Sequence, residues 1–193
     1  GAADRATLAA SITAARAADG GWATQPGAAG GTAYGCFLAV NALADLGLPA
    51  PDIAVRTAIA NCLDRLRSAD GGYTNAAGQA QGSTTATAAA VVTLVSLELT
   101  VPSGAVALDA QRHPTGGFVA GPDTPLPDLL AAAVALHALD AVEAPWRDSR
   151  ERMLDFLDSL WSAEGAFHGS WADDQADAEY NFYGLVALGH ASV

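Results

Sequence analysis

A motif of two small residues and an aromatic recurs four times along the 193-residue chain, and it constrains the fold more than any other feature. The four copies are Gly20-Gly21-Trp22, Gly71-Gly72-Tyr73, Gly116-Gly117-Phe118 and Gly165-Ala166-Phe167. In each copy the eleventh residue after the second small residue is Thr32, Ser83, Asp128 or Asp177, and a leucine follows eleven residues later. A spacing kept four times without a gap predicts tandem repeats of one structural unit.

Each repeat has the pattern of two helices. The polar residue after the motif is a good N-cap, and the stretch behind it is apolar nearly all round, as in a helix covered on several sides. We therefore expect inner helices over 33–46, 84–97, 129–139 and 178–188. Stretches with one polar face precede the motifs, and they predict outer helices over 5–17, 53–67, 103–111 and 146–161.

Composition supports a helical protein and excludes several functions. Alanine makes up 46 of the residues, which favours helix. The net charge of −12, without a basic patch, argues against binding to nucleic acid or to anionic membranes. No apolar run reaches the roughly 18 residues of a membrane span. Two cysteines without a CxxC pair, and an N-terminus without a secretory pattern, predict a cytoplasmic protein.

The repeat resembles the one shared by protein prenyltransferase β-subunits and triterpene cyclases such as squalene–hopene cyclase. The segments 19–22, 70–74 and 115–118 carry the resemblance best, and 177–185 is similar to the last inner helix of bacterial members. The resemblance implies an all-α fold, an α/α toroid whose inner helices line a central apolar cavity for an isoprenoid. We expect one domain over 1–193, with four hairpin repeats at roughly 1–46, 47–100, 101–142 and 143–193.

Four hairpins do not complete such a ring. At about 48 residues per hairpin, a ring of six needs roughly 290 residues. An incomplete ring exposes apolar helix surface, which repeat proteins cap or bury. We therefore expect a homo-oligomer or a partner subunit that completes the ring, unless the chain is a fragment.

The resemblance also implies two alternative chemistries. Zinc-dependent prenylation needs an Asp, a Cys and a His, and the matching positions hold Asp128, Leu130 and Tyr180. Leucine cannot coordinate zinc, so we predict no metal site of that kind. Acid-initiated cyclisation needs a protonated carboxyl group at the start of an inner helix. The fourth repeat offers Asp177 and Glu179 there, which we predict as the catalytic acid or base.

Aromatic and polar side chains near these acids predict a substrate site. Aromatic faces stabilise developing positive charge, so we expect Tyr180, Tyr183 and Trp171 to line the cavity. We also expect His168, Tyr34 and Asp128 to contact the substrate. Because Asp177 and Glu179 are two positions apart, we expect only one of them to face the cavity.

Simpler interpretations stay open. Capping alone accounts for Asp177 and Asp128, the helix dipole accounts for Glu179, and the tyrosines can fill the terminal core. The pair Asp173-Asp174 suggests Mg²⁺ with a diphosphate, although such a pair is more often a solvated loop; we expect no other cofactor. The alternative to an enzyme is a non-catalytic module that binds an apolar ligand or a partner.

Overall fold

The protein is a chain of four helix pairs, described here by a computed structural model over residues 1–25, 27–173 and 175–192. The outer members are α1 (Ala2–Ala14), α3 (Ile53–Arg65), α5 (Gly104–Asp109) and α7 (Arg150–Ser159), the last preceded by the 3₁₀ turn η1 (Arg147–Ser149). The inner members are α2 (Ala33–Asp45), α4 (Thr84–Ser96), α6 (Leu129–Ala141) and α8 (Ala178–Ala191).

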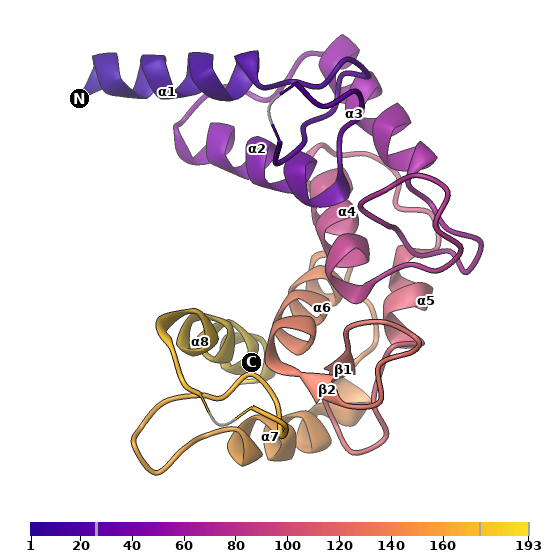
Figure 1. Cartoon of the computed structure of the whole chain (residues 1–193), viewed down its shortest axis with the longest axis vertical. Coiled ribbons are helices and arrows are strands. Elements are labelled where there is room, and N and C mark those ends of the chain that lie inside the picture. The colour runs from indigo at the N-terminus through magenta and orange to yellow at the C-terminus, as the bar shows by residue number, and fades with distance from the viewer. Residues whose placement is uncertain (26, 174, 193) are drawn as a thin grey trace.

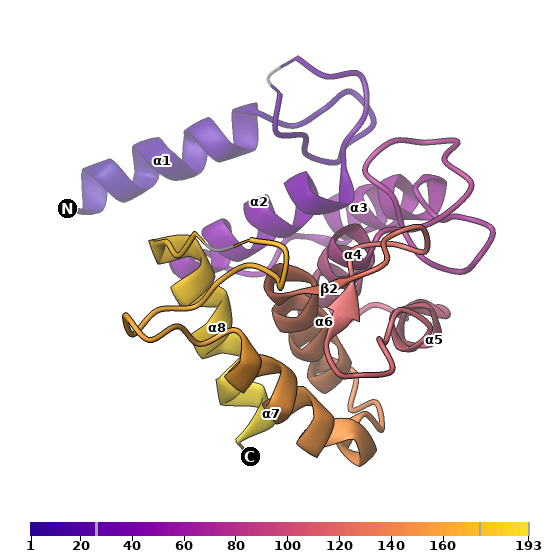
Figure 2. The same cartoon turned by 60° about the horizontal axis from the view of Figure 1, so that its bottom comes forward.

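The inner helices form an arc. Helix α2 packs on α4, α4 on α6 and α6 on α8. Figure 1 shows the result as an open curve, with α3, α5 and α7 on its convex side and with α2 and α8 at either end of its concave side. Figure 2, turned by 60°, shows the same succession. The expected partial α/α toroid of four hairpins is confirmed.

The glycine motif forms the same tight turn in every repeat. The first glycine has a positive φ, between 84° and 106° at positions 20, 71, 116 and 165, which side chains disfavour. In the second repeat Gly71 N–H donates to the Ser68 carbonyl, and Ser68 N–H donates to the Gly72 carbonyl. The aromatic that follows is buried each time, as Trp22, Tyr73, Phe118 or Phe167. The turn thus ends the outer helix and inserts a ring into the core.

The predicted caps are confirmed for all four inner helices. The side chains of Thr32, Ser83, Asp128 and Asp177 accept hydrogen bonds from the backbone N–H three residues on. Each cap residue has an extended backbone and satisfies one of the free N–H groups at a helix start.

The outer helices end earlier than predicted because the turn takes their last residues, and α1 also begins three residues earlier than predicted. Helices α1 and α3 end at Ala14 and Arg65, and α7 ends at Ser159, since the N–H groups of Ala17, Ser68 and Ser162 bond across the turn. Helix α5 covers only Gly104–Asp109, and η1 replaces the first turn predicted for the last outer helix. Two short strands, β1 (Phe118–Val119) and β2 (Pro127–Asp128), pair antiparallel and depart from a purely helical fold.

Each loop also contacts the inner helix of the preceding repeat. Leu129 N–H, at the start of α6, donates to the Gly169 carbonyl over 2.8 Å. Thr84 N–H, at the start of α4, donates to the Ala120 carbonyl over 2.9 Å. These bonds bring the starts of neighbouring inner helices to one edge of the arc, where the candidate site lies. No helix in the described part of the chain is long and apolar enough to cross a membrane.

Candidate functional site

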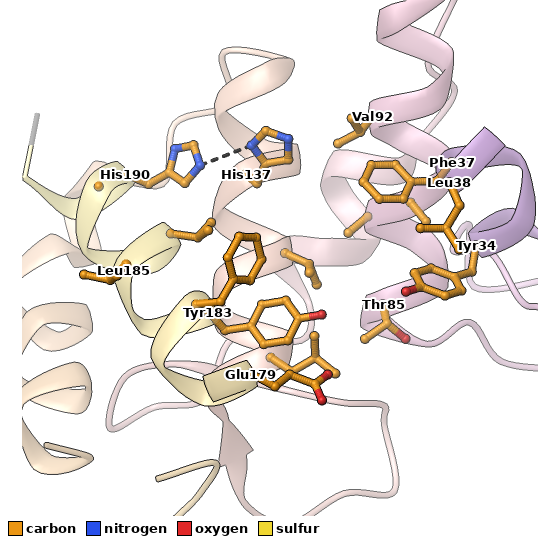
Figure 3. Close-up of a pocket in the computed structure, with 17 residues that line it drawn as sticks. Tyr34, Phe37, Leu38, Thr85, Val92, His137, Glu179, Tyr183, Leu185 and His190 are labelled. Atoms are coloured by element: carbon orange, nitrogen blue, oxygen red, sulfur yellow. Dashed lines mark hydrogen bonds between the residues drawn. The ribbon is translucent and has the colours of Figure 1, made fainter. Parts of the chain in front are cut away.

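The concave face of the arc holds a cavity of about 940 Å³. All four inner helices line it from equivalent positions. The second residue after each cap contributes Tyr34, Thr85, Leu130 and Glu179, and the sixth contributes Leu38, Ala89, Val134 and Tyr183. These residues are four apart, so they share one face of each helix. Figure 3 shows the face of α8 with Glu179 and Tyr183 opposite Tyr34 and Phe37 of α2.

The lining of this cavity is mainly apolar, and the cavity is open to solvent on one side. Phe37, Val92 and Val186 add to it from three helices. Phe182 and Leu185 of α8 remain 61% and 68% exposed, although they are large apolar residues. A lining of this kind suits an apolar ligand, because covering these side chains removes them from water.

A second cavity, of about 300 Å³, adjoins the first at the starts of α6 and α8. It brings together five of the predicted site residues: Asp128, Asp177, Glu179, Tyr180 and Tyr183. Leu130, Glu179 and Tyr183 line both cavities. The smaller cavity thus places carboxyl groups at one end of the larger one.

Two of these carboxyl groups are fixed by their capping bonds. Asp128 Oδ1 accepts from Ala131 N–H over 2.7 Å, and Asp177 Oδ1 accepts from Tyr180 N–H over 2.8 Å. Burial raises the pKa of Asp128, against the lowering effect of the hydrogen bonds from Ala131 and Leu130. Asp128 therefore keeps its proton to a higher pH than an exposed aspartate does.

Asp177 and Glu179 both line the small cavity. The expectation that only one of them faces the cavity concerned the large central one, and it does not apply to the small cavity. Asp177 is the cap, with φ −141° and ψ 179°, so its side chain does not follow the helix. Of the two, only Glu179 also lines the large cavity.

The two tyrosines have raised pKa values. For Tyr183 the causes are burial first, then the charges of Tyr34 and Glu179, which line the same cavity. For Tyr180 they are burial, then Asp173, with smaller effects of Asp177 and Glu179. Both phenols are therefore neutral donors beside the carboxyl groups at neutral pH.

Trp171 and His168 lie away from both cavities, contrary to their predicted places. Trp171 packs on Phe156 with 5.7 Å between ring centroids, and its Nε1 donates to Ser159 of α7 over 2.8 Å. His168 forms a β-bridge with Ala176, and its Nδ1 is buried without a hydrogen-bond partner among the described residues. Between His168 and Trp171, the Gly169 carbonyl accepts the hydrogen bond from Leu129 N–H at the start of α6.

The residues at the two metal sites considered from the sequence do not fit a zinc ion or a magnesium ion. Leu130, at the position of the zinc-binding cysteine, lines both cavities and offers no donor atom. In the suggested Mg²⁺ pair, Asp173 Oδ1 accepts from Gln175 N–H over 3.0 Å, and Asp174 lies outside the described residues.

The sequence interpretation missed a hydrogen-bonded chain at the other end of the large cavity. His137 of α6 and His190 of α8 both line it, and their rings bond to each other over 3.2 Å (Figure 3). His190 Nδ1 also bonds to Asp140 Oδ2 over 2.6 Å. A signal for His137 was present, because it is the ninth residue after its cap, like Val92 and Val186. No spacing connects His137 to His190 in the sequence.

Comparisons with known proteins agree with this architecture. The model of the family described as "Prenyltransferase alpha-alpha toroid domain" matches residues 30–109 and 104–189. A comparison with curated proteins finds no match.

Several solved structures share the fold. The ent-copalyl diphosphate synthase from Streptomyces platensis superposes with a TM-score of 0.69 at 20% identity, over 97% of this chain and 36% of that one. A variant of the type II terpene cyclase MstE from Scytonema, in complex with geranylgeranyl dihydroxybenzoate as substrate, gives a TM-score of 0.66 at 18% identity. The match covers 100% of this chain and 59% of that one. Another MstE variant, in complex with merosterolic acid A as product, gives a TM-score of 0.65 at 18% identity, over 100% of this chain and 60% of that one. The chain therefore spans between about a third and three fifths of the cyclases it matches.

Proposed function

Because the chain belongs to the family of prenyltransferase alpha-alpha toroid domains, we propose that it acts on a polyprenyl or similar apolar substrate by acid-initiated cyclisation. The observation that carries the proposal is the position of Glu179. This carboxyl group lines the large apolar cavity and also the small cavity that holds Asp128 and Asp177. The fold similarity to type II terpene cyclases supports the substrate class.

The chemistry follows from this arrangement. Glu179, in its protonated form, gives its proton to an alkene or an epoxide at the end of the substrate and becomes a carboxylate. With an alkene, the π electron pair forms the new C–H bond. With an epoxide, an oxygen lone pair forms the O–H bond, and the C–O bond breaks with its electron pair going to oxygen. The resulting cation lies along the cavity, where Tyr183 and Phe182 present aromatic rings that stabilise positive charge. Asp177 lines the same small cavity as Glu179. Asp128, with its raised pKa, is a neutral neighbour over a wider pH range.

Carbocation chemistry requires the exclusion of water, and the open arc leaves the cavity exposed. Tyr34 and Leu38 on α2 are 44% and 42% exposed, opposite the exposed Phe182 and Leu185 of α8. We propose that a second toroid segment, from a second copy or from a partner, covers these rims. A mass of twice the monomer in light scattering supports the second copy, whereas a stable monomer at high concentration contradicts it.

The alternative function is a non-catalytic module that binds an apolar ligand in the same cavity. The observation that favours it is the capping role of Asp128 and Asp177, which already accounts for both side chains. Binding and catalysis are therefore measured separately in the test.

The test compares three variants with a matched control. Glu179→Gln removes the acid at the junction of the cavities. Asp177→Asn and Asp128→Asn keep a good N-cap while they remove a proton donor, so the helices stay intact. Glu164→Gln makes the same change at an exposed position in the turn of the fourth repeat. Each protein is incubated with farnesol, geranylgeraniol, their diphosphates and squalene, and products are identified by mass spectrometry.

We expect cyclic products from the wild type and from Glu164→Gln. We expect Glu179→Gln to lose about 10²–10⁴-fold in rate, the usual contribution of a general acid. Turnover that survives both Glu179→Gln and Asp177→Asn contradicts the catalytic roles. If no compound is turned over but one binds and raises the unfolding temperature, the binding module is the correct function.

A further inference from the structure

The hydrogen-bonded chain from Asp140 to His137 fixes which ring nitrogens carry protons. Asp140 Oδ1 accepts from Trp146 Nε1 over 2.6 Å and pairs with Arg147 over 3.1 Å, and its Oδ2 faces His190 Nδ1. Burial raises the pKa of Asp140, but the bonds from Trp146 and His190, with the charge of Arg147, lower it overall. Asp140 is therefore an ionised, acceptor-only group at neutral pH.

The ionised carboxylate of Asp140 determines which ring nitrogens of His190 and His137 carry hydrogens. His190 Nδ1 must carry a hydrogen to bond to the carboxylate, so in the neutral ring His190 Nε2 is an acceptor. The ring nitrogen opposite it, His137 Nδ1, must then be the donor across 3.2 Å. This leaves the lone pair of neutral His137 on Nε2. Burial, with the adjacent His190, lowers the pKa of His137 against the effect of Asp140, which favours the neutral ring.

His137 Nε2 has no hydrogen-bond partner among the described residues, although the ring lies in the cavity lining. Its neighbours in that lining are apolar, with Val134 one turn earlier on α6 and Val92 at the equivalent position of α4. Figure 3 shows His137 on the side of the cavity that faces Val92 and Phe37. The His137 side chain is exposed to the open cavity, so water satisfies this acceptor until a ligand that carries a donor takes the place of that water.

We propose that His137, oriented by His190 and Asp140, is a hydrogen-bond-accepting subsite for the hydroxyl group of an apolar alcohol or phenol. This subsite sets the direction of the ligand. Glu179 and His190 are eleven residues apart on α8, about 16 Å along the helix axis. A ligand whose hydroxyl bonds to His137 therefore directs its apolar tail toward the carboxyl groups. The proposal rests on the proposed function only in that the cavity holds an apolar chain.

The first measurement compares two ligands that differ in one donor. Equilibrium dialysis with labelled farnesol and farnesyl methyl ether gives the two affinities for the same apolar chain. We expect the wild type to bind the alcohol about three- to tenfold more tightly, the usual effect of one hydrogen bond. His137→Leu removes the acceptor and is expected to bind both compounds equally.

Asp140→Asn separates orientation from structure. The oxygen of the introduced amide stays with Trp146 and Arg147, so the amide NH₂ group faces His190 Nδ1 and donates to it. His190 then carries its hydrogen on Nε2 and donates to His137, whose own hydrogen moves to Nε2. We expect the preference for the alcohol to disappear while the affinity for the ether is unchanged. Asp155→Asn, on the exposed side of α7, is the matched control and keeps the preference.

Nitrogen-15 NMR of labelled histidine reads the protonated nitrogens without any ligand. We expect the hydrogen on Nδ1 of His137 in the wild type and on Nε2 in Asp140→Asn. A wild-type ring protonated on Nε2, or equal affinities for alcohol and ether, overturns the subsite and leaves the proposed function intact. Failure of the wild type to bind either compound overturns both. A loss of affinity for both compounds in Asp140→Asn identifies a merely structural role and overturns the orienting one.

Discussion

Replacement of the third buried aromatic tests how the glycine motif holds the arc together. Phe118 is 1% exposed, lies in the core with α6, and pairs through its backbone with Asp128. Phe118→Ala removes a fully buried ring and leaves a cavity, which costs about 3–5 kcal/mol. Phe182→Ala removes the same atoms from a side chain that is 61% exposed. Because only about two fifths of the Phe182 side chain is buried and its removal leaves no closed cavity, Phe182→Ala costs about 1 kcal/mol or less.

Urea unfolding followed by circular dichroism measures both free energies of unfolding, and thermal unfolding measures the melting temperatures. In a chain of this length 1 kcal/mol shifts the melting temperature by roughly 2–4 °C. We therefore expect a fall of about 6–20 °C for Phe118→Ala and at most about 4 °C for Phe182→Ala. If Phe118→Ala does not fold, Phe118→Leu serves instead; it removes fewer buried atoms and leaves a smaller cavity, so it costs less than the alanine variant. A difference below about 1 kcal/mol between the two alanine variants refutes the role given to the buried aromatics.

Three further predictions concern packing, burial and charge. Gly184→Ala places a Cβ against the ring of Phe167, the fourth buried aromatic, and is expected to cost about 1–3 kcal/mol. Gly189→Ala meets nothing within 4 Å and is expected to stabilise α8 by up to about 1 kcal/mol. Equal melting temperatures of the two variants contradict this contrast. Cys36 and Cys62 are 0% and 1% exposed, so thiol reagents are expected to label them only on unfolding, and rapid labelling of the native protein argues against the burial. Burial raises the pKa of Asp70, but a serine hydroxyl and two glycine N–H groups lower it overall. The ionised Asp70 therefore stabilises the fold fully above about pH 5, and this stabilisation is lost as the pH falls through the pKa of Asp70 in the folded protein. Asp70→Asn is expected to flatten that decline when the free energy of unfolding is measured in urea at successive pH values.

The repeat made most of the fold predictable. Four copies of one spacing located the turns, the caps and the inner helices, because each copy repeats the same local physics. The ends of the outer helices could not be read in the same way. The hydrogen bonds that end α1 and α3 cross the glycine turn, and composition near Ala15 or Leu66 does not reveal them.

The candidate site was predictable where it depends on the register of the helices. Tyr34, Glu179 and Tyr183 occupy the positions that line the cavity in every repeat. Trp171 lies in a loop outside the helical register, so the repeat spacing does not predict where its side chain packs. The pairing of His137 with His190 brings together residues 53 apart in the sequence, and only the packing of α6 on α8 creates it.

A crystal structure of the protein grown with geranylgeraniol tests the central claim most directly. We expect electron density for the chain along the concave face, between α2 and α8, with its hydroxyl at His137 and its tail beside Glu179. Density confined to the convex surface, or a concave face that stays empty at saturating ligand, would contradict the account.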